Sequence, residues 1–308
     1  MHVKRDQQSA HGTWVRVSVA GLLAGAVLLL FRSFAPGGTA TSTTASRVVI
    51  SLASGLLYVA ILAPLALRLS MGLWLRLGAV FLTLYVTGTL TDLLEAYFYT
   101  TALTPFSLAA ALVFLALQAL VIALLVVLVV RPSGVASDPH RRPGLAETEH
   151  RPLANWTWRV LLAGVLYVPI YYAFAATVTP IEHEFYYDPT FIAQLHTTVP
   201  PTEVTIALEA VRGLLFVLAL LPTLSVVPRQ RWVSVVYLGL IGAVLEGWVP
   251  LLGQTTWPLA MRLGNFVELT GDAFGRALVV MVLLGTLGAR WLPRVRRAHQ
   301  QSVGRSGR

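Results

Sequence analysis

Long apolar runs recur along the chain, with short polar segments between them. A helix needs about 20 apolar residues to cross a bilayer, because each residue rises about 1.5 Å and the hydrocarbon core is about 30 Å thick. Runs of this length predict an all-α, polytopic transmembrane helical bundle of about eight spans. The predicted spans are residues 13–34, 47–69, 73–98, 106–130, 157–179, 204–227, 232–252 and 262–289.

Composition agrees with a membrane protein. The 308 residues are 56% hydrophobic and only 12% charged, whereas a soluble domain carries roughly 25% charged residues. The lipid bilayer is therefore the expected environment and partner. The chain contains no cysteine, which excludes disulfides, thiol catalysis and thiolate metal sites.

The net charge of +9 is distributed in a way that predicts topology. Basic residues concentrate in alternate segments between the predicted spans, which is the pattern of cytoplasmic loops and not of a nucleic-acid surface. We therefore expect both termini on the cytoplasmic side, in the cytoplasmic (inner) membrane of a bacterium, and no nucleic-acid partner. These segments hold Lys4, Arg5, Arg16, Arg68, Arg76, Arg131, Arg141, Arg142, Arg151, Arg159, Arg229, Arg231, Arg290, Arg294, Arg296, Arg297, Arg305 and Arg308.

The chain divides into two four-helix halves. The first half covers residues 1–130, and residues 131–156 form a cytoplasmic linker rich in Pro, Arg, His and Gly. The second half covers residues 157–308, with an acidic extracytoplasmic loop at 180–203 and a basic cytoplasmic tail at 290–308. The first apolar run also has the character of a signal peptide, but the repeat described next favours its retention.

Four short blocks recur in the same order in both halves and predict a parallel duplication. An even number of spans per half gives both halves the same orientation, as the charges require. The pairs are Thr13-Trp14 with Thr157-Trp158, Ala20-Gly21 with Ala163-Gly164, Gly55-Leu56-Leu57 with Gly213-Leu214-Leu215, and Leu94-Glu95-Ala96-Tyr97 with Leu245-Glu246-Gly247-Trp248.

The last predicted span carries a polar stripe. Asn265, Glu268, Asp272 and Arg276 fall within an arc of roughly 80° at helical spacing. A charged side chain at the bilayer midplane costs about 2.5–3.5 kcal/mol on insertion scales. We therefore expect this stripe to face protein or water.

Other spans add charged groups at a similar depth, in the half of the membrane away from the basic loops. The sixth span has Glu209 and Arg212, the seventh has Glu246, and the third has Asp92 and Glu95. We predict one polar cavity that opens to the outside. It holds six acids against two arginines, so some carboxyl groups should be protonated, bind a cation or face water.

The duplication gives this site an internal comparison. Ser51 and Ser54 align with Glu209 and Arg212, and apolar residues of the fourth span align with the polar stripe of the eighth. The charged site therefore belongs mainly to the second half. Spacings such as Glu209–Arg212 and Asp272–Arg276 are also those of intrahelical ion pairs, which would act only in helix packing.

The acidic loop is expected to cover the cavity as a solvated segment. It has metal-ligand residue types but no diagnostic spacing, so we assign it no metal. The sequence identifies no cofactor and contains no phosphate loop, zinc-protease motif, serine elbow or redox pair. The residues concerned are Glu182, His183, Glu184, Asp188, His196 and Glu203.

Two further local predictions concern helix geometry. The spacings Gly21–Gly25 and Gly271–Gly275 favour close contact between helices. Pro169 is expected to kink the fifth span, and the surrounding Tyr167, Tyr171, Tyr172 and Phe174 are interpreted as an interfacial belt or core packing.

Three functions are compatible with these features. The first is a proton- or cation-coupled transporter in which Glu246, Glu268 and Asp272 bind the proton or cation while Arg212 and Arg276 tune them or hold an anionic group of a small solute. The second is an intramembrane enzyme acting on a lipid-linked or envelope substrate at the outer leaflet, with carboxylates as acid and base. The third is a non-catalytic assembly or sensory subunit. We rank transport first because duplicated halves suit it.

Overall fold

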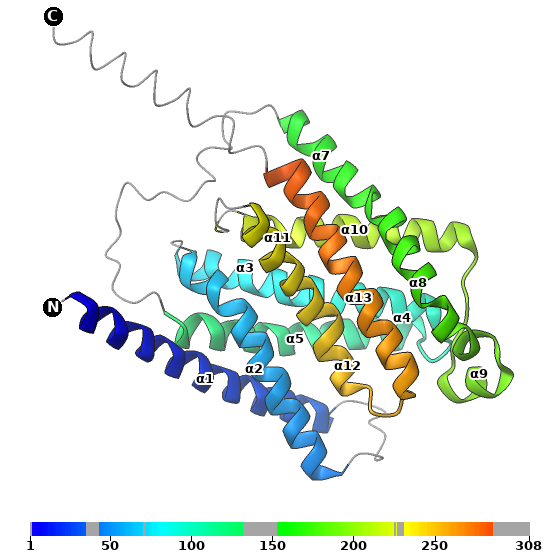
Figure 1. Cartoon of the computed structure of the whole chain (residues 1–308). Helices are drawn as coiled ribbons and strands as arrows, with labels where there is room; N and C mark the ends of the chain where they lie inside the picture. Colours follow the sequence, from blue (N-terminus) through cyan, green and yellow to red (C-terminus); the bar gives the residue numbers. More distant parts are fainter. Residues whose placement is uncertain are drawn as a thin grey trace, which may run out of the picture.

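The computed structural model describes residues 2–34, 43–69, 72–131, 153–224, 226 and 231–285. Over these residues the chain forms helices and no strand; the sole β-type pairing is an isolated bridge between Thr100 and Thr197. Figure 1 shows the helices packed side by side in one bundle. The expected linker at 131–156 and tail at 290–308 lie mostly or wholly outside the described residues.

The first half of the chain forms four long helical segments. They are α1 (His2–Phe34), α2 (Thr44–Arg68), the continuous run of α3 (Leu73–Tyr85), η1 (Val86–Leu90) and α4 (Thr91–Tyr99), and α5 (Pro105–Val129).

The second half forms a further series of helices, one of which is a short surface helix. It contains α7 (Leu153–Val165), α8 (Tyr167–Tyr187), α9 (Pro189–Leu195), α10 (Thr202–Leu224), the run of α11 (Arg231–Gly242), η2 (Ala243–Trp248) and α12 (Val249–Gly253), and finally α13 (Leu259–Val280) with η3 (Met281–Gly285).

The prediction of an all-α bundle with several membrane-crossing helices is confirmed. Within the described residues, seven segments are long and apolar enough to span a membrane. They are Gly12–Phe34, Thr44–Arg68, Leu73–Tyr99, Pro105–Val129, Asn155–Tyr187, Thr202–Leu224 and Trp232–Gly253. Helix α13 is not among these seven, and it carries the charged residues Arg262, Glu268, Asp272 and Arg276.

Two predicted boundaries in the second half are wrong. Residues 153–156, assigned to the linker, already belong to α7, and residues 180–187, assigned to the acidic loop, continue α8. Pro180 lies inside α8 without ending it. The break that Pro169 predicts is present, but it falls three residues earlier, at Leu166 between α7 and α8. A proline lacks the amide that would bond the preceding turn, so the break lies on its N-terminal side.

Glycines allow the closest helix contacts. A Cβ atom built on Gly55 of α2 would overlap the backbone of Gly25 on α1, and one built on Gly213 of α10 would overlap the carbonyl group of Gly164 on α7. The predicted close approach at Gly21 and Gly25 is confirmed, because both lie against α2. Small residues stabilise helix pairs in membranes because the backbones can approach closely.

The spacing Gly271–Gly275 on α13 is likewise a site of close contact. A Cβ atom on Gly271 would overlap the ring of Phe174, and one on Gly275 would lie 2.9 Å from Ile170 Cγ2. Both partners belong to α8. The α8–α13 pair forms one side of the charged site described below.

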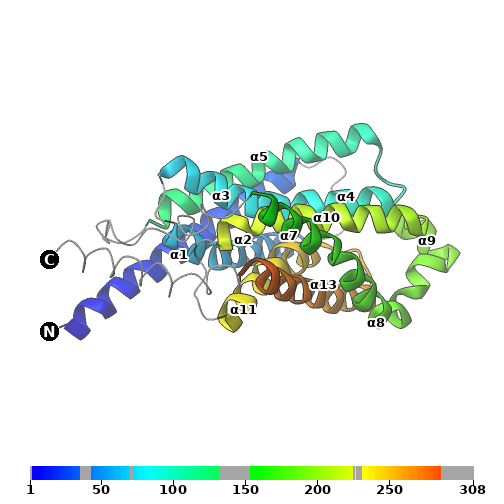
Figure 2. The same ribbon diagram turned by 90° about the horizontal axis from the view of Figure 1, so that it is seen from above.

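The two halves contact each other mainly through the second and third long helical segments of each half. Helix α10 packs on α3, η1 and α4, while α2 packs on η2 and α12, and η1 contacts η2 at the centre. Figure 2 places α5 and α13 on opposite flanks of this interface. Gly88 in η1 lies against the carbonyl oxygen of Leu245 in η2, which a Cβ atom would approach to 2.9 Å.

The runs α3–η1–α4 and α11–η2–α12 each contain a widened π-helical segment, η1 and η2 respectively. In the first, the Thr91 hydroxyl donates to the carbonyl oxygen of Val86 at 3.0 Å, which supplies a side-chain bond where the regular backbone pattern changes. Such segments are rare and concentrate at functional sites. Here η2 carries Glu246, and η1 directly precedes α4, which carries Asp92 and Glu95.

Enlarging the contact glycines should destabilise the bundle. We expect Gly55→Ala or Gly213→Ala to cost about 1–3 kcal/mol, the usual penalty for overpacking, and to lower the thermal unfolding temperature of the detergent-purified protein. Gly78→Ala is the matched control, because a Cβ atom there has no neighbour within 4 Å. Equal effects at all three positions would contradict the assignment of Gly55 and Gly213 to tight contacts.

Candidate functional site

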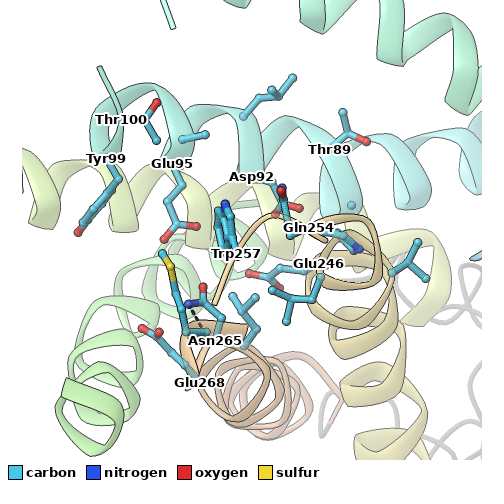
Figure 3. A pocket seen from close by; sticks show the side chains of 18 of the residues that line it. Thr89, Asp92, Glu95, Tyr99, Thr100, Glu246, Gln254, Trp257, Asn265 and Glu268 are labelled. Atoms are coloured by element: carbon cyan, nitrogen blue, oxygen red, sulfur yellow. Dashed lines mark hydrogen bonds between the residues drawn. The ribbon is translucent and has the colours of Figure 1, made fainter. Parts of the chain in front are cut away.

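A cavity of about 620 Å³ lies at the end of the bundle where α4, α8 and α12 end and α5, α10 and α13 begin. Its size is typical of small-molecule sites, which occupy about 300–1,000 Å³. Both halves contribute to its walls. Figure 3 shows Asp92 and Glu95 projecting from α4 toward Glu246 and Asn265 on the opposite helices, with Trp257 between them.

Arg212 on α10 forms ion pairs with carboxylates from three helical segments. Its Nη1 donates to both carboxylate oxygens of Glu209, at 2.9 and 2.8 Å. Its Nη2 lies 2.6 Å from Glu95 Oε2 and 3.5 Å from Glu246 Oε1. The side chains of Arg212, Glu209 and Glu246 are buried, whereas 28% of the Glu95 side chain is exposed. Arg212, Glu246 and Glu95 all line the cavity, and Glu95 is the most exposed of them.

Arg276 on α13 extends this cluster through Glu246. Its Nη2 donates to Glu246 Oε2 at 2.5 Å, so Glu246 bridges the two arginines. The Arg276 guanidinium carbon also lies 3.5 Å from the ring centroid of Phe216 and 5.3 Å from that of Tyr167. Aromatic faces attract a desolvated guanidinium. Five ionisable residues thus form a continuous network that is buried except at Glu95 (Glu95, Glu209, Glu246, Arg212 and Arg276), which we call the charged layer.

Local sequence places these side chains. Glu209 and Arg212 are one turn apart on α10, a spacing that brings their side chains together. Gly242 makes room for the arginine on the facing helix, since a Cβ atom there would lie 2.7 Å from Arg276 Nη2. The charged layer therefore depends on a small residue as much as on its charges.

Three other acids have no countercharge within ion-pair distance among the described residues. Asp272 is 1% exposed; its Oδ2 accepts a hydrogen bond from the Tyr167 hydroxyl at 3.3 Å, while its Oδ1 has no hydrogen-bond partner among the described residues. Asp92 and Glu268 also line the cavity, and in the part of the chain that the structure describes neither forms a hydrogen bond or ion pair. These carboxyl groups remain available to a ligand.

The residues of the predicted acidic loop lie in two different environments, one buried and one at the surface. Glu182 is buried at the end of α8, where its Oε1 accepts a hydrogen bond of 2.8 Å from Asn265 Nδ2. A Cβ atom on Gly264 would overlap the Glu182 carboxyl group, so this glycine permits the contact. The expectation of a fully solvated loop is therefore wrong for Glu182, because α8 continues past Pro180 and turns this residue toward α13.

The other residues of this segment lie at the surface. His183 lines the cavity and stacks on Tyr187, with ring centroids 4.3 Å apart. Glu184 and His196 are exposed and do not line the cavity, and His196 has a left-handed backbone with φ of 56°. Among the described residues, no group of three or more His, Asp or Glu residues could hold a metal ion.

Asp188 has a structural role in this segment. Its carboxylate accepts a hydrogen bond of 2.7 Å from the Thr190 backbone amide and caps the start of α9. This bond to the backbone amide, together with one to the Thr190 side chain, lowers the pKa of Asp188 below its usual value.

The structure brings most of the predicted site residues together. Arg212, Arg276, Glu209, Glu246 and Asp272 are buried in or beside the charged layer. Asn265, Glu268, Asp92, Glu95, Glu182 and His183 line the cavity. Of the predicted contributors, only Glu184 and His196 lie elsewhere.

Sequence reasoning missed several cavity residues. Arg32 was not assigned to the site, yet it lines the cavity and donates to Ser51 Oγ at 3.3 Å. Tyr171 packs with Tyr167 and Phe216 in a buried cluster, in agreement with the expected core packing, and it also lines the cavity. Aromatic and amide residues near the ends of the predicted spans could have indicated these additional cavity-lining positions. The missed lining includes Tyr58, Tyr186, Gln118, Gln254 and Trp257.

The chain has no significant match to any protein-family model, curated protein or solved structure. Its function must therefore be inferred from the site itself.

Removing Arg212 should destabilise the protein in a pH-dependent way. Arg212→Met leaves the carboxyl groups of Glu95, Glu209 and Glu246 without their shared cation, and breaking a buried ion pair in this way costs about 3–5 kcal/mol. Lowering the pH should restore part of the loss, because protonation removes the repulsion among the carboxylates. Thermal unfolding between neutral and acidic pH measures both effects.

The control for this variant is Arg68→Met, which removes an exposed arginine at the end of α2. It should change the unfolding temperature little at any pH. An Arg212→Met variant that behaved like Arg68→Met would show that the charged layer does not hold the helices together.

Proposed function

We propose that this protein is a proton- or cation-coupled membrane transporter that binds a small solute in the cavity. The observation that carries the proposal is the excess of carboxyl groups. Seven acids line the cavity or belong to the charged layer beneath it, against three arginines. Carboxyl groups crowded in a low-dielectric interior cannot all remain ionised at low cost. Some of them must be protonated, or a cation must compensate their charge. The acids are Asp92, Glu95, Glu182, Glu209, Glu246, Glu268 and Asp272, and the arginines are Arg32, Arg212 and Arg276.

The contacts of α13 support its assignment as an eighth span. Its polar side chains Asn265, Glu268 and Asp272 line the cavity, and Arg276 belongs to the charged layer. Its other faces expose Leu263, Phe266, Val267 and Leu278 on the outside of the bundle. A helix with this distribution can cross a bilayer with its charges turned inward.

Repeated packing supports a parallel duplication. The α1–α2 pair meets through Gly21 and Gly55, and the α7–α10 pair meets through the aligned Gly164 and Gly213. The pairs α3–α5 and α1–α5 in the first half correspond to α11–α13 and α8–α13 in the second. Two similar halves on either side of a central site suit a transporter that moves one half against the other.

The distribution of charge supports a cavity that faces outward. Arg76 and Arg159 lie at the opposite end of the bundle, where they donate to the carbonyl oxygens of Val127 and Leu283. Arginine-rich ends face the cytoplasm, so we place both termini on the cytoplasmic side of a bacterial inner membrane and the cavity on the external side.

The alternatives account for fewer observations. Helix packing alone explains the ion pairs of the charged layer, but it gives no role to Asp92 and Glu268, which face the cavity without a countercharge. An enzyme acting on a lipid-linked phosphate would need guanidinium groups that are free to bind the phosphate. Arg212 and Arg276 are engaged by Glu209, Glu95 and Glu246. Arg32 is left alone against the seven acids.

Alternating access can be tested with single cysteines, because the natural chain has none. Thr223 is fully buried on α10, eleven residues beyond Arg212 and away from the cavity. If the protein transports, Thr223→Cys should react with a membrane-impermeant thiol reagent only from the cytoplasmic side, in a state in which that end opens. Thr179→Cys, at a cavity-lining position, should react from the external side.

Charge removal should alter the balance between these two states. Glu268→Gln with Asp272→Asn should change the labelling rate of Thr223→Cys by about tenfold or more, since differential protonation energies of 1.4 kcal/mol already shift an equilibrium tenfold. Glu184→Gln, which removes an exposed acid outside the cavity, is the control. Failure of Thr223→Cys to react from the cytoplasmic side at any pH would rule out a transport cycle.

A further inference from the structure

The wall chemistry of the cavity restricts its ligand. One wall is apolar and belongs to the first half: Leu28 and Phe31 from α1 face Phe114 and Leu115 from α5, with the rings of Phe31 and Phe114 5.1 Å apart. The facing acids come from α4 and α13. A ligand that fills this space therefore meets hydrocarbon on one side and carboxyl groups on the other.

The acidic side has a buried acceptor with no partner. Asp272 is 1% exposed and lines the cavity, and its Oδ1 accepts no hydrogen bond from the described residues. A buried carboxylate oxygen without a donor is costly. Glu268 lies one turn earlier on the same face of α13 and also lines the cavity without a countercharge. A ligand that donates hydrogen bonds and carries positive charge would satisfy both.

Aromatic side chains adjoin these acids. Tyr99 and Tyr171 join α4 and α8 through a hydroxyl–hydroxyl hydrogen bond of 2.8 Å, and Tyr186 packs edge-on against Tyr99 with centroids 6.5 Å apart. All three line the cavity. Aromatic rings beside carboxylates are a typical environment for organic ammonium groups, because the ring face attracts cations.

An anionic ligand fits this site poorly. Arg212 already binds three carboxylates, and Arg276 binds Glu246. Arg32 is the remaining cavity arginine, and it donates a hydrogen bond to the neutral Ser51 hydroxyl. One guanidinium does not offset the unpaired acids that share the cavity.

We propose that the solute bound in this cavity is an amphiphilic organic cation, with its ammonium-type group at Glu268 and Asp272 and its apolar body against Phe31 and Phe114. This inference rests on the proposed transport function and names its substrate class. The acids without a countercharge select the positive group, and the apolar wall selects against small hydrophilic cations. A proton and such a cation would compete for the same carboxylates, which provides a means of coupling.

The test uses two probes of the same shape and opposite charge. Radiolabelled tetraphenylphosphonium should bind saturably to the purified full-length protein in lipid nanodiscs, whereas the isosteric anion tetraphenylborate should not displace it. Lower pH should weaken the binding, because protons neutralise the acids. Methylammonium, which lacks an apolar body, should compete at least tenfold more weakly than tetraphenylphosphonium does.

Variants then locate the two parts of the site. Glu268→Gln should reduce tetraphenylphosphonium affinity about tenfold or more, and Asp272→Asn should act in the same direction. Phe114→Ala should weaken tetraphenylphosphonium and leave methylammonium unchanged. Glu184→Gln is the matched control, and unfolding temperatures verify that each variant is folded. Should Asp272→Asn fail to fold, Glu268→Gln tests the same role, since Glu268 lies on the cavity wall outside the charged layer.

Three results would overturn the inference: tetraphenylborate binding in place of the cation, absence of saturable binding of both cationic probes, or unchanged affinity in Glu268→Gln. The cysteine measurements separate this failure from failure of the transport proposal. If Thr223→Cys reacts from the cytoplasmic side while no organic cation binds, the protein transports a solute of another class. If neither occurs, both proposals fail together.

Discussion

The arrangement of this bundle depends on the compensation of charge around Arg212. A lone guanidinium or carboxylate inside a low-dielectric bundle costs several kcal/mol, so α10 can hold Arg212 only where acids from other helices reach it. Glu209 comes from the same helix, Glu95 from α4 and Glu246 from η2. Satisfying one cation therefore fixes the depth and rotation of three helical segments, and Glu246 carries the same constraint to Arg276 on α13.

The charged layer also separates two environments. On one side lies the cavity with its unpaired acids. On the other lies an apolar core in which Thr83 joins α3 to the carbonyl oxygen of Ala219 on α10 at 3.1 Å. Close packing on that side relies on small residues, because glycines let α1 approach α2 and α7 approach α10. The cavity thus lies on one side of the charged layer, while close packing fills the described part of the bundle on the other side.

Periodicity predicted the parts of the site that lie within one helix. The stripe of Asn265, Glu268, Asp272 and Arg276 follows from helical spacing, and the seven apolar segments follow from hydropathy. The partners of Arg212 on other helices could not be read from spacing, because they depend on which helices are neighbours. Glu182 was misplaced because the fifth span was expected to end at residue 179, whereas α8 continues to Tyr187. Arg32 was missed because its depth and its neighbours are set by packing between helices.

The proposed duplication explains why the site is acidic. Glu95 and Glu246 occupy the same place in the two repeated blocks, yet both approach the same nitrogen, Arg212 Nη2. A second arginine at the aligned position, Ser54, would bring two guanidinium groups toward the shared centre. The first half instead has Ser51 and Ser54, both fully buried. The first half thus contributes Asp92 and Glu95 to the cavity with Arg32 as their only arginine from that half. This excess of carboxyl groups is what favours a bound proton or cationic ligand in the proposed function.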